Sequence, residues 1–143
     1  MPYCTLTDIK KLIPEERLVQ LTDDEGVGVV NEARVDEAIA QADMEINAYL
    51  GGRYTVPFSS PVPDIVRKLS MDMAIYHLYS RKLEEIPQTR KDRYDGAIRI
   101  LKGITEGKIS IGEATEPAGE SDSAQVSTSE DDRIFTRDKL SGF

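Results

Sequence analysis

The chain has 143 residues, of which 39% are hydrophobic and 31% are charged, and its formal net charge is −8. This length suits one domain, and the composition is typical of a soluble protein with a modest apolar core. No stretch approaches the roughly 20 apolar residues of a membrane span, and the N-terminal residues lack the basic and apolar regions of a signal peptide. We therefore expect no membrane segment and synthesis in the cytoplasm.

The charge is distributed unevenly along the chain. Residues 1–50 carry four Lys or Arg against eleven Asp or Glu, residues 51–112 carry eleven against seven, and residues 113–143 carry three against eight. An acidic chain is a poor general ligand for nucleic acid, because phosphate contacts need clustered cations. The basic middle suits an acidic surface of a neighbouring copy or partner, and the alternative is that these charges are solvated helix faces.

Two short helices are predicted first. Thr5 and Asp8 have the spacing of a capping box, which predicts a helix to about Leu12. Pro14 suits the first turn of a second helix, because it has no amide hydrogen to lose there. The apolar side of this second helix consists of Leu18, Val19 and Leu21. Residues 22–28, rich in aspartate and glycine, predict a loop.

Three longer helices follow. Apolar residues at spacings of three and four predict a helix over 34–50, and the two glycines after it would end it in the left-handed conformation. A helix over about 62–83 is apolar on two sides, which indicates a central place in a bundle. A final helix covers about 88–106, and Gly107 ends it.

These elements predict an all-α protein, a small helical bundle of four to five helices over residues 1–112, although 108–111 alternate like a very short strand. Residues 113–130 hold mostly small and polar residues, which cannot offset their ordering entropy by burial. Residues 113–143 are therefore predicted to be an acidic flexible linker and an extended, partly disordered C-terminal arm. The arm carries apolar residues that we expect to order on docking, namely Ile134, Phe135, Leu140 and Phe143. The alternative is a frayed terminus.

The sequence offers no clear catalytic site. His77, the sole histidine, borders the apolar face of its helix and is expected to be structural, because one histidine cannot supply the usual metal-ligand set. Cys4, the sole cysteine, has no visible activating neighbour. We expect no enzymatic activity, no metal and no cofactor.

Paired acidic residues leave one alternative, a metal-dependent all-α hydrolase that binds Mg²⁺ through acids on facing helices. The acids within 34–50 lie mostly opposite the apolar stripe and are expected in water; they are Asp36, Glu37, Asp43 and Glu45. A second group flanks a proline break and comprises Glu84, Glu85, Asp92 and Asp95. A solvated face is the better account of both groups.

Four stretches together resemble one family. They are ADMEINAYLGGRY at 42–54, DMAIYHLY at 72–79, RYDGAIRIL at 93–101 running on to GKISIG, and DRIFTRDKL at 132–140. Their order and spacing resemble the Mu-like phage and prophage neck proteins, a group of head–tail connector (adaptor) proteins. The resemblance covers nearly the whole chain and is weakest over 113–130.

The resemblance implies a structural protein that joins the portal vertex of a filled capsid to the tail. Copies would form a ring around the DNA channel, about twelve of them if they follow portal symmetry. The implied partners are the portal protein, neighbouring copies and the next tail-side neck or tail-completion protein, while DNA passes without sequence-specific binding. The implied location is the neck of the virion, after assembly in the bacterial cytoplasm.

On this interpretation the arm at 131–143 binds the portal or an adjacent subunit through its four apolar anchors. Arg53 and Tyr54 either fix the 51–61 connection, because an arginine at such a junction can bond free carbonyls, or reach a neighbour. An acidic face within 36–45 would line the channel. The alternative is a small helical regulatory or scaffolding module that binds one protein through its arm, and stoichiometry separates the two.

Overall fold

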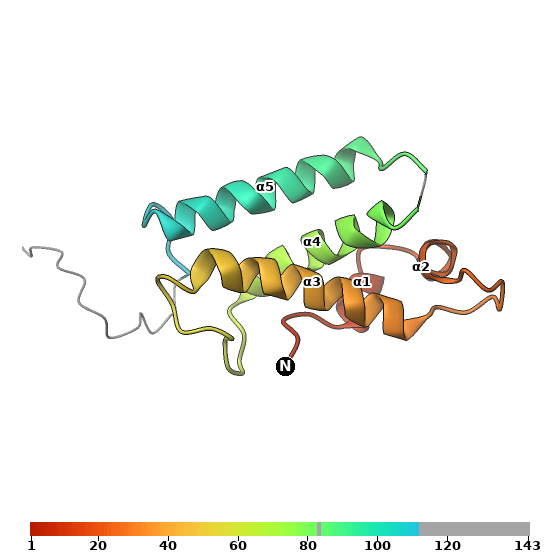
Figure 1. Ribbon diagram of the computed structural model, residues 1–143, viewed down its shortest axis with the longest axis horizontal. Coiled ribbons are helices and arrows are strands. Elements are labelled where there is room, and N and C mark those ends of the chain that lie inside the picture. The colour runs from red at the N-terminus through yellow and green to blue at the C-terminus, as the bar shows by residue number, and fades with distance from the viewer. Residues whose placement is uncertain (83, 112–143) are drawn as a thin grey trace, which may run out of the picture.

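The computed structural model describes residues 1–82 and 84–111, and this part of the chain contains five helices and no strand (Figure 1). The helices are α1 (Leu6–Lys10), α2 (Glu15–Thr22), α3 (Glu32–Leu50), α4 (Asp64–Ser80) and α5 (Gln88–Thr105). The predicted all-α class and number of helices are confirmed. The predicted linker and arm at 113–143 lie outside the described residues.

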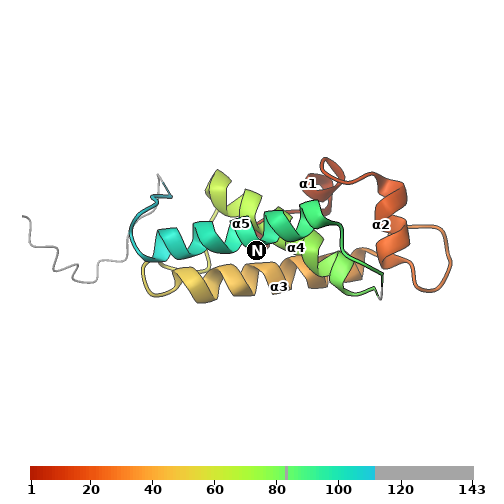
Figure 2. The ribbon, with the colours of Figure 1, turned by 90° about the horizontal axis from the view of Figure 1, so that it is seen from above.

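The three long helices form an up–down–up arrangement in which each packs against the other two (Figures 1 and 2). The short helices α1 and α2 lie toward one end of the bundle, where both contact α3 and α4. Every described helix lacks the length or the apolar character that a bilayer crossing requires. The three long helices therefore form one bundle, and the two short helices cover α3 and α4 at one end of it.

Helix α4 occupies the centre of the core, as its two apolar sides predict. It contacts all four other helices. Its buried apolar side chains are Val66, Leu69, Met73, Ala74, Ile75 and Leu78. By contrast, α3 buries a single stripe, which consists of Val35, Ala38, Ile39, Ala42, Ile46 and Leu50. A helix buried on more than one side must be enclosed by its neighbours, and this is what places α3 and α5 on either flank.

The start of α1 has the predicted capping box. The Asp8 amide donates to Thr5 Oγ1 at 3.3 Å, and the Thr5 amide donates to Asp8 Oδ2 at 3.0 Å. These bonds satisfy two amides that the first helical turn leaves without backbone partners. The helix ends at Lys10, earlier than predicted, and the chain then turns with the Leu12 amide donating to the Ile9 carbonyl at 3.0 Å.

The predicted left-handed glycine at the end of α3 is wrong. Gly51 has φ of −62°, which is right-handed helical backbone. The chain instead winds on, so that the amides of Arg53 and Tyr54 donate to the Leu50 carbonyl at 3.0 and 2.8 Å. This extra turn brings Tyr54 into the core, where its side chain is buried, and burial of that ring accounts for the tighter exit.

Residues 108–111, which alternate like a very short strand, do not form one. The amides of Lys108 and Ile109 both donate to the Gly103 carbonyl, at 2.9 and 3.1 Å, and so close the end of α5. Gly107 makes this turn with φ of +80°, as its predicted role at the helix end requires. The alternation at 108–111 therefore reflects the packing of Ile109 and Ile111 against the core rather than strand pairing.

Two methionines test the central place of α4. Met73 on α4 is 0% exposed, whereas Met44 on α3 is 63% exposed. Met73→Ala should lower the free energy of unfolding by about 2–5 kcal/mol, because it removes buried contacts and leaves a cavity. The matched change Met44→Ala should stay within about 0.5 kcal/mol of the parent chain. Urea denaturation followed by circular dichroism measures both, and equal losses would contradict this assignment of the core.

Candidate interaction surfaces

Glu45 joins the three long helices at a polar cluster. Its Oε2 accepts a hydrogen bond from the Tyr94 hydroxyl at 2.8 Å, and its Oε1 lies 2.7 Å from His77 Nε2 without hydrogen-bond alignment. The Tyr94 ring stacks on Tyr76 at 4.1 Å, and His77 meets both rings edge-on. Burial, together with the bond to Glu45 and its charge, raises the pKa of Tyr94. His77 thus has the structural place that the sequence predicts.

Asp43 ties the N-terminal segment to the bundle. Its Oδ2 accepts from the Tyr3 amide at 2.9 Å, and its Oδ1 accepts from the Ser70 hydroxyl at 2.6 Å. Burial raises the pKa of this carboxyl despite those two bonds. The prediction that Asp43 and Glu45 face water is therefore wrong, because side chains from other helices reach both carboxylates. Asp36 and Glu37 are exposed as predicted.

The Cys4 thiol lies in the same buried region. It is 1% exposed, and its Sγ lies 3.2 Å from Ser70 Oγ. Burial raises the pKa of Cys4 to about 12. The reactive thiolate is therefore scarce near neutral pH, and the group acts as part of the core. Among the residues that the structure describes, no three His, Cys, Asp or Glu side chains are arranged to hold a metal ion.

The two junction residues lie against the end of α5. Arg53 Nη1 donates to the Ile104 carbonyl at 3.0 Å, and its guanidinium sits 5.7 Å from the Tyr54 ring centroid. Tyr54 is 3% exposed. The arginine thus adds a side-chain hydrogen bond to a carbonyl at the helix end that also accepts from the Gly107 amide at 3.1 Å. Contact of either residue with a neighbouring copy stays a prediction, and the arm anchors Ile134, Phe135, Leu140 and Phe143 lie outside the described residues.

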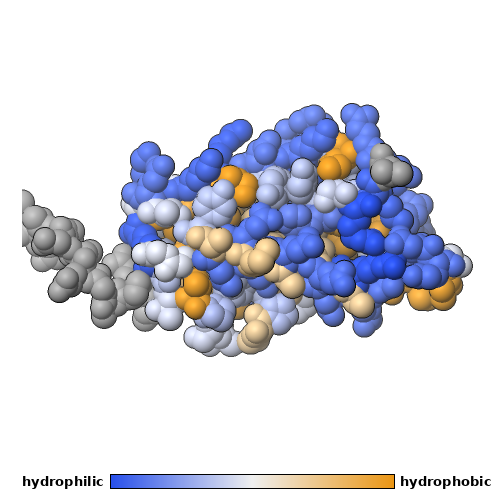
Figure 3. Space-filling model, viewed as in Figure 1, coloured by the Kyte–Doolittle hydropathy of each residue, from blue (hydrophilic) through white to orange (hydrophobic). Residues whose placement is uncertain are grey.

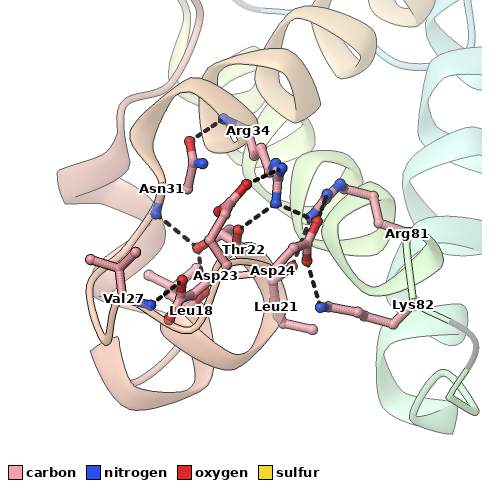
Figure 4. A network of polar contacts seen from close by, with 11 residues as sticks. Leu18, Leu21, Thr22, Asp23, Asp24, Val27, Asn31, Arg34, Arg81 and Lys82 are labelled. Atoms are coloured by element: carbon pink, nitrogen blue, oxygen red, sulfur yellow. Dashed lines mark hydrogen bonds and ion pairs between the residues drawn. The ribbon is translucent and has the colours of Figure 1, made fainter.

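The loop between α2 and α3 is fixed by charged side chains (Figure 4). Asp24 accepts hydrogen bonds from Lys82 Nζ at 2.7 Å and from Arg81 Nη2 at 2.9 Å, and it also pairs with Arg34. These cations, with the bonds from Lys82 and Arg81 first, lower the pKa of Asp24 to about 2. The loop is thereby attached to the C-terminal end of α4.

Asp23 shapes the tip of the same loop from within. Its carboxylate accepts from the amides of Val27 and Gly28 at 3.0 and 2.7 Å, and these bonds lower the pKa of Asp23. Val27 and Val29 are 69% and 61% exposed, and Figure 3 shows an apolar patch at the end of the molecule that this loop forms. This loop is fixed by the contacts of Asp23 and Asp24 and exposes two valines to solvent, so it is a candidate docking element.

A groove of about 650 Å³ lies along the outer side of α3, where the N-terminal residues and the 51–63 connection border the helix. Its apolar lining consists of Met1, Pro2, Ile39, Ala40, Met44 and Pro57. Its polar lining consists of Asp36, Asp43 and Asn47. An apolar floor with carboxylates beside it suits a peptide that carries both apolar and basic side chains.

The sequence predicts the loop at 22–28, but neither the ion pairs that fix it nor the groove. Asp23, Asp24 and the nearby glycines signal a turn, but the cations that hold Asp24 come from α3 and from the far end of α4. The groove depends on how the N-terminal residues fold back onto α3, through bonds such as Phe58 N to Tyr3 Oη at 3.0 Å. One feature of the sequence pointed to the groove: Met44 is a large apolar residue opposite the α3 stripe, and in the structure it is exposed.

The comparisons with known proteins give the family. The family model described as Bacteriophage Mu, Gp36 matches residues 3–129. The chain belongs to this family. The matched residues of the Bacteriophage Mu Gp36 family include all five helices, whereas the four arm anchors lie beyond them.

Two relatives extend this result. The Mu-like prophage FluMu protein gp36 of Haemophilus influenzae is 36% identical over 83 residues, which are 58% of this chain and 56% of the relative. Gene product J of Escherichia phage Mu is 29% identical over 145 residues, which are 100% of this chain and 99% of the relative. The chain thus matches little more than half the length of the first relative and nearly all of the second. The resemblance to Mu-like phage and prophage proteins is confirmed.

Asp24→Asn tests the attachment of the loop in this Gp36 family member. Removing the negative charge weakens three contacts, so the amides of residues 23–31 should exchange with solvent faster. Hydrogen exchange read by mass spectrometry measures this. The matched change Asp36→Asn, at an exposed acid on α3, should leave the loop unchanged. Equal exchange in both variants would show that Asp24 does not hold the loop.

The same contacts predict a pH dependence. The pKa of Asp24 is lowered from 3.8 to about 2 in the folded chain, so the folded state binds fewer protons than the unfolded state in this range. The stabilisation is fully present above the unfolded pKa and is lost as the pH falls toward 2. Thermal unfolding at a series of pH values should therefore show the gap between the parent and Asp24→Asn closing below about pH 4.

Proposed function

We propose that this Bacteriophage Mu Gp36 family member is a structural head–tail connector (adaptor) of a tailed phage or prophage. In this proposal copies form a ring below the portal in the neck of the virion, join the DNA-filled head to the tail, and contact the next tail-side neck protein. The observation that carries it is the family match over residues 3–129, together with relatives from phage Mu and a Mu-like prophage.

The surface of the described residues supports contacts between copies. Exposed acids on α3 include Glu32, Asp36 and Glu37, whereas exposed bases on α5 include Arg93, Arg99 and Lys102. Opposite charges on two helices of one bundle suit a head-to-tail contact, in which the acidic helix of one copy meets the basic helix of the next. Such contacts close into a ring when the rotation between copies fits.

The proposal includes no enzymatic activity and no cofactor. The acids of the hydrolase alternative, Glu84, Glu85, Asp92 and Asp95, are all exposed. Asp92 accepts a hydrogen bond from Gln88 of its own helix at 2.8 Å, as an ordinary solvated helix face does. The second candidate, a regulatory or scaffolding module that binds one protein through its arm, requires the same arm contacts without a ring.

The arm anchors test the connector proposal. The double variant Phe135→Asp/Leu140→Asp places two charges at positions that should be buried on docking, so it should abolish rings on the cognate portal protein. The control Ser121→Asp/Ser127→Asp adds the same charge to the polar linker and should still form rings. Co-expression with the portal followed by electron microscopy measures both. No ring with the parent chain would count against the connector, and one copy per partner would favour the regulatory module.

A further inference from the structure

The groove on α3 has a candidate occupant within the chain itself. Residues 133–140 read RIFTRDKL, with three basic residues, one acidic residue and the apolar Ile134, Phe135 and Leu140. The groove offers an apolar floor that includes Ile39 and Met44, with two carboxylates in its lining. The apolar residues of the segment can pack on the apolar floor, and its basic residues can pair with the carboxylates.

The acidic side of this match is available. Asp36 is exposed on α3, and the described residues give it no ion pair. Asp43 is half-buried, with both of its oxygens already hydrogen-bonded to Tyr3 and Ser70. Asp36 is therefore the carboxylate that can pair with an incoming arginine. Asp43 keeps its two hydrogen bonds and adds only a longer-range electrostatic attraction.

The route from the last described residue to the groove is short. Ile111 lines a small pocket together with Pro61 of the connection between α3 and α4 and with Ile65 at the start of α4. The same connection supplies Pro57 to the groove and places Phe58 against Tyr3, with ring centroids 5.8 Å apart. The connection between α3 and α4 therefore borders both Ile111, the last described residue, and the groove.

The length of the intervening chain permits binding within one molecule. Residues 112–132 reach about 70 Å when fully extended and about 25 Å as a flexible coil. Helix α3, with 19 residues, is only about 28 Å long. Such a tether holds residues 133–140 at an effective concentration of about 1 mM at the groove, which exceeds the concentration of other copies in dilute solution.

We propose that residues 133–140 occupy the α3 groove of their own molecule in the free protein. Ile134 and Phe135 lie on the apolar floor, and a flanking arginine pairs with Asp36. This contact goes beyond the connector function and stands without it. If the connector proposal also holds, the portal must displace the segment before it can use the same anchors.

Disulfide trapping in the full-length chain tests the contact. Oxidation of the variant Met44→Cys/Phe135→Cys should give an intramolecular disulfide in a monomer, because the segment brings position 135 to the groove. The matched pair Lys102→Cys/Phe135→Cys places the first cysteine on the exposed side of α5 and should react about tenfold more slowly. Native Cys4 is buried, so it does not compete.

A charge change separates docking from chance encounter. Adding Asp36→Lys to the Met44→Cys/Phe135→Cys chain should slow trapping to the rate of the Lys102 pair. Adding Glu37→Lys, the same charge change at the next residue and outside the groove, should leave the rate within about twofold of the parent pair. Both positions are exposed, and circular dichroism checks that the fold persists.

Three results would overturn the proposal. Equal trapping rates at positions 44 and 102 would mean that the segment does not prefer the groove. Disulfide-linked dimers as the main product would assign the groove to a second copy. Equal slowing of trapping by Asp36→Lys and Glu37→Lys would mean that only the overall charge of α3 matters and not a specific pair with Asp36. None of these results touches the connector proposal, which depends on rings formed with the portal.

Discussion

The requirement to cover α4 on all its apolar sides governs the rest of the structure. Fully buried side chains such as Leu69, Met73 and Leu78 cover most of this helix. Its exposed residues are Asp64, Arg67, Lys68 and Ser80. Because α3 and α5 enclose it, each of them needs only one apolar stripe, and their outer faces are free to carry charge. The short helices α1 and α2 close the remaining part of the core. The surfaces available to partners are therefore the outer sides of α3 and α5 and the loops at the ends.

Features that depend on local periodicity could be predicted from the sequence. Features that depend on contacts between residues far apart in the chain could not. The stripe of α3 and the two-sided character of α4 could be assigned because spacings of three and four persist over many turns. The exit from α3 could not, because the conformation of Gly51 follows from burial of Tyr54 by other helices. The alternation at 108–111 was uninformative for the same reason, since four alternating residues do not reveal that Ile109 packs back on Gly103.

The candidate surfaces show this limit more clearly. A helical projection places Asp43 and Glu45 away from the α3 stripe, but it cannot show that Ser70 of α4 and Tyr94 of α5 reach them. The loop after α2 could be recognised from its aspartates and glycines, whereas its attachment through Arg81 joins residues far apart in sequence. The family resemblance could be recognised because it needs only the order and spacing of short motifs along the chain.

The contact between Arg53 and the end of α5 places an evolutionary constraint on a distant position. Gly107 has φ of +80°, and a Cβ there would lie 2.6 Å from Arg53 Nη1. A larger residue at 107 would therefore strain the turn and also displace the guanidinium from the Ile104 carbonyl. A chain without the arginine would escape the second penalty but not the first. Among relatives, the glycine should persist wherever this arginine does, while a change of the arginine alone should be tolerated more often.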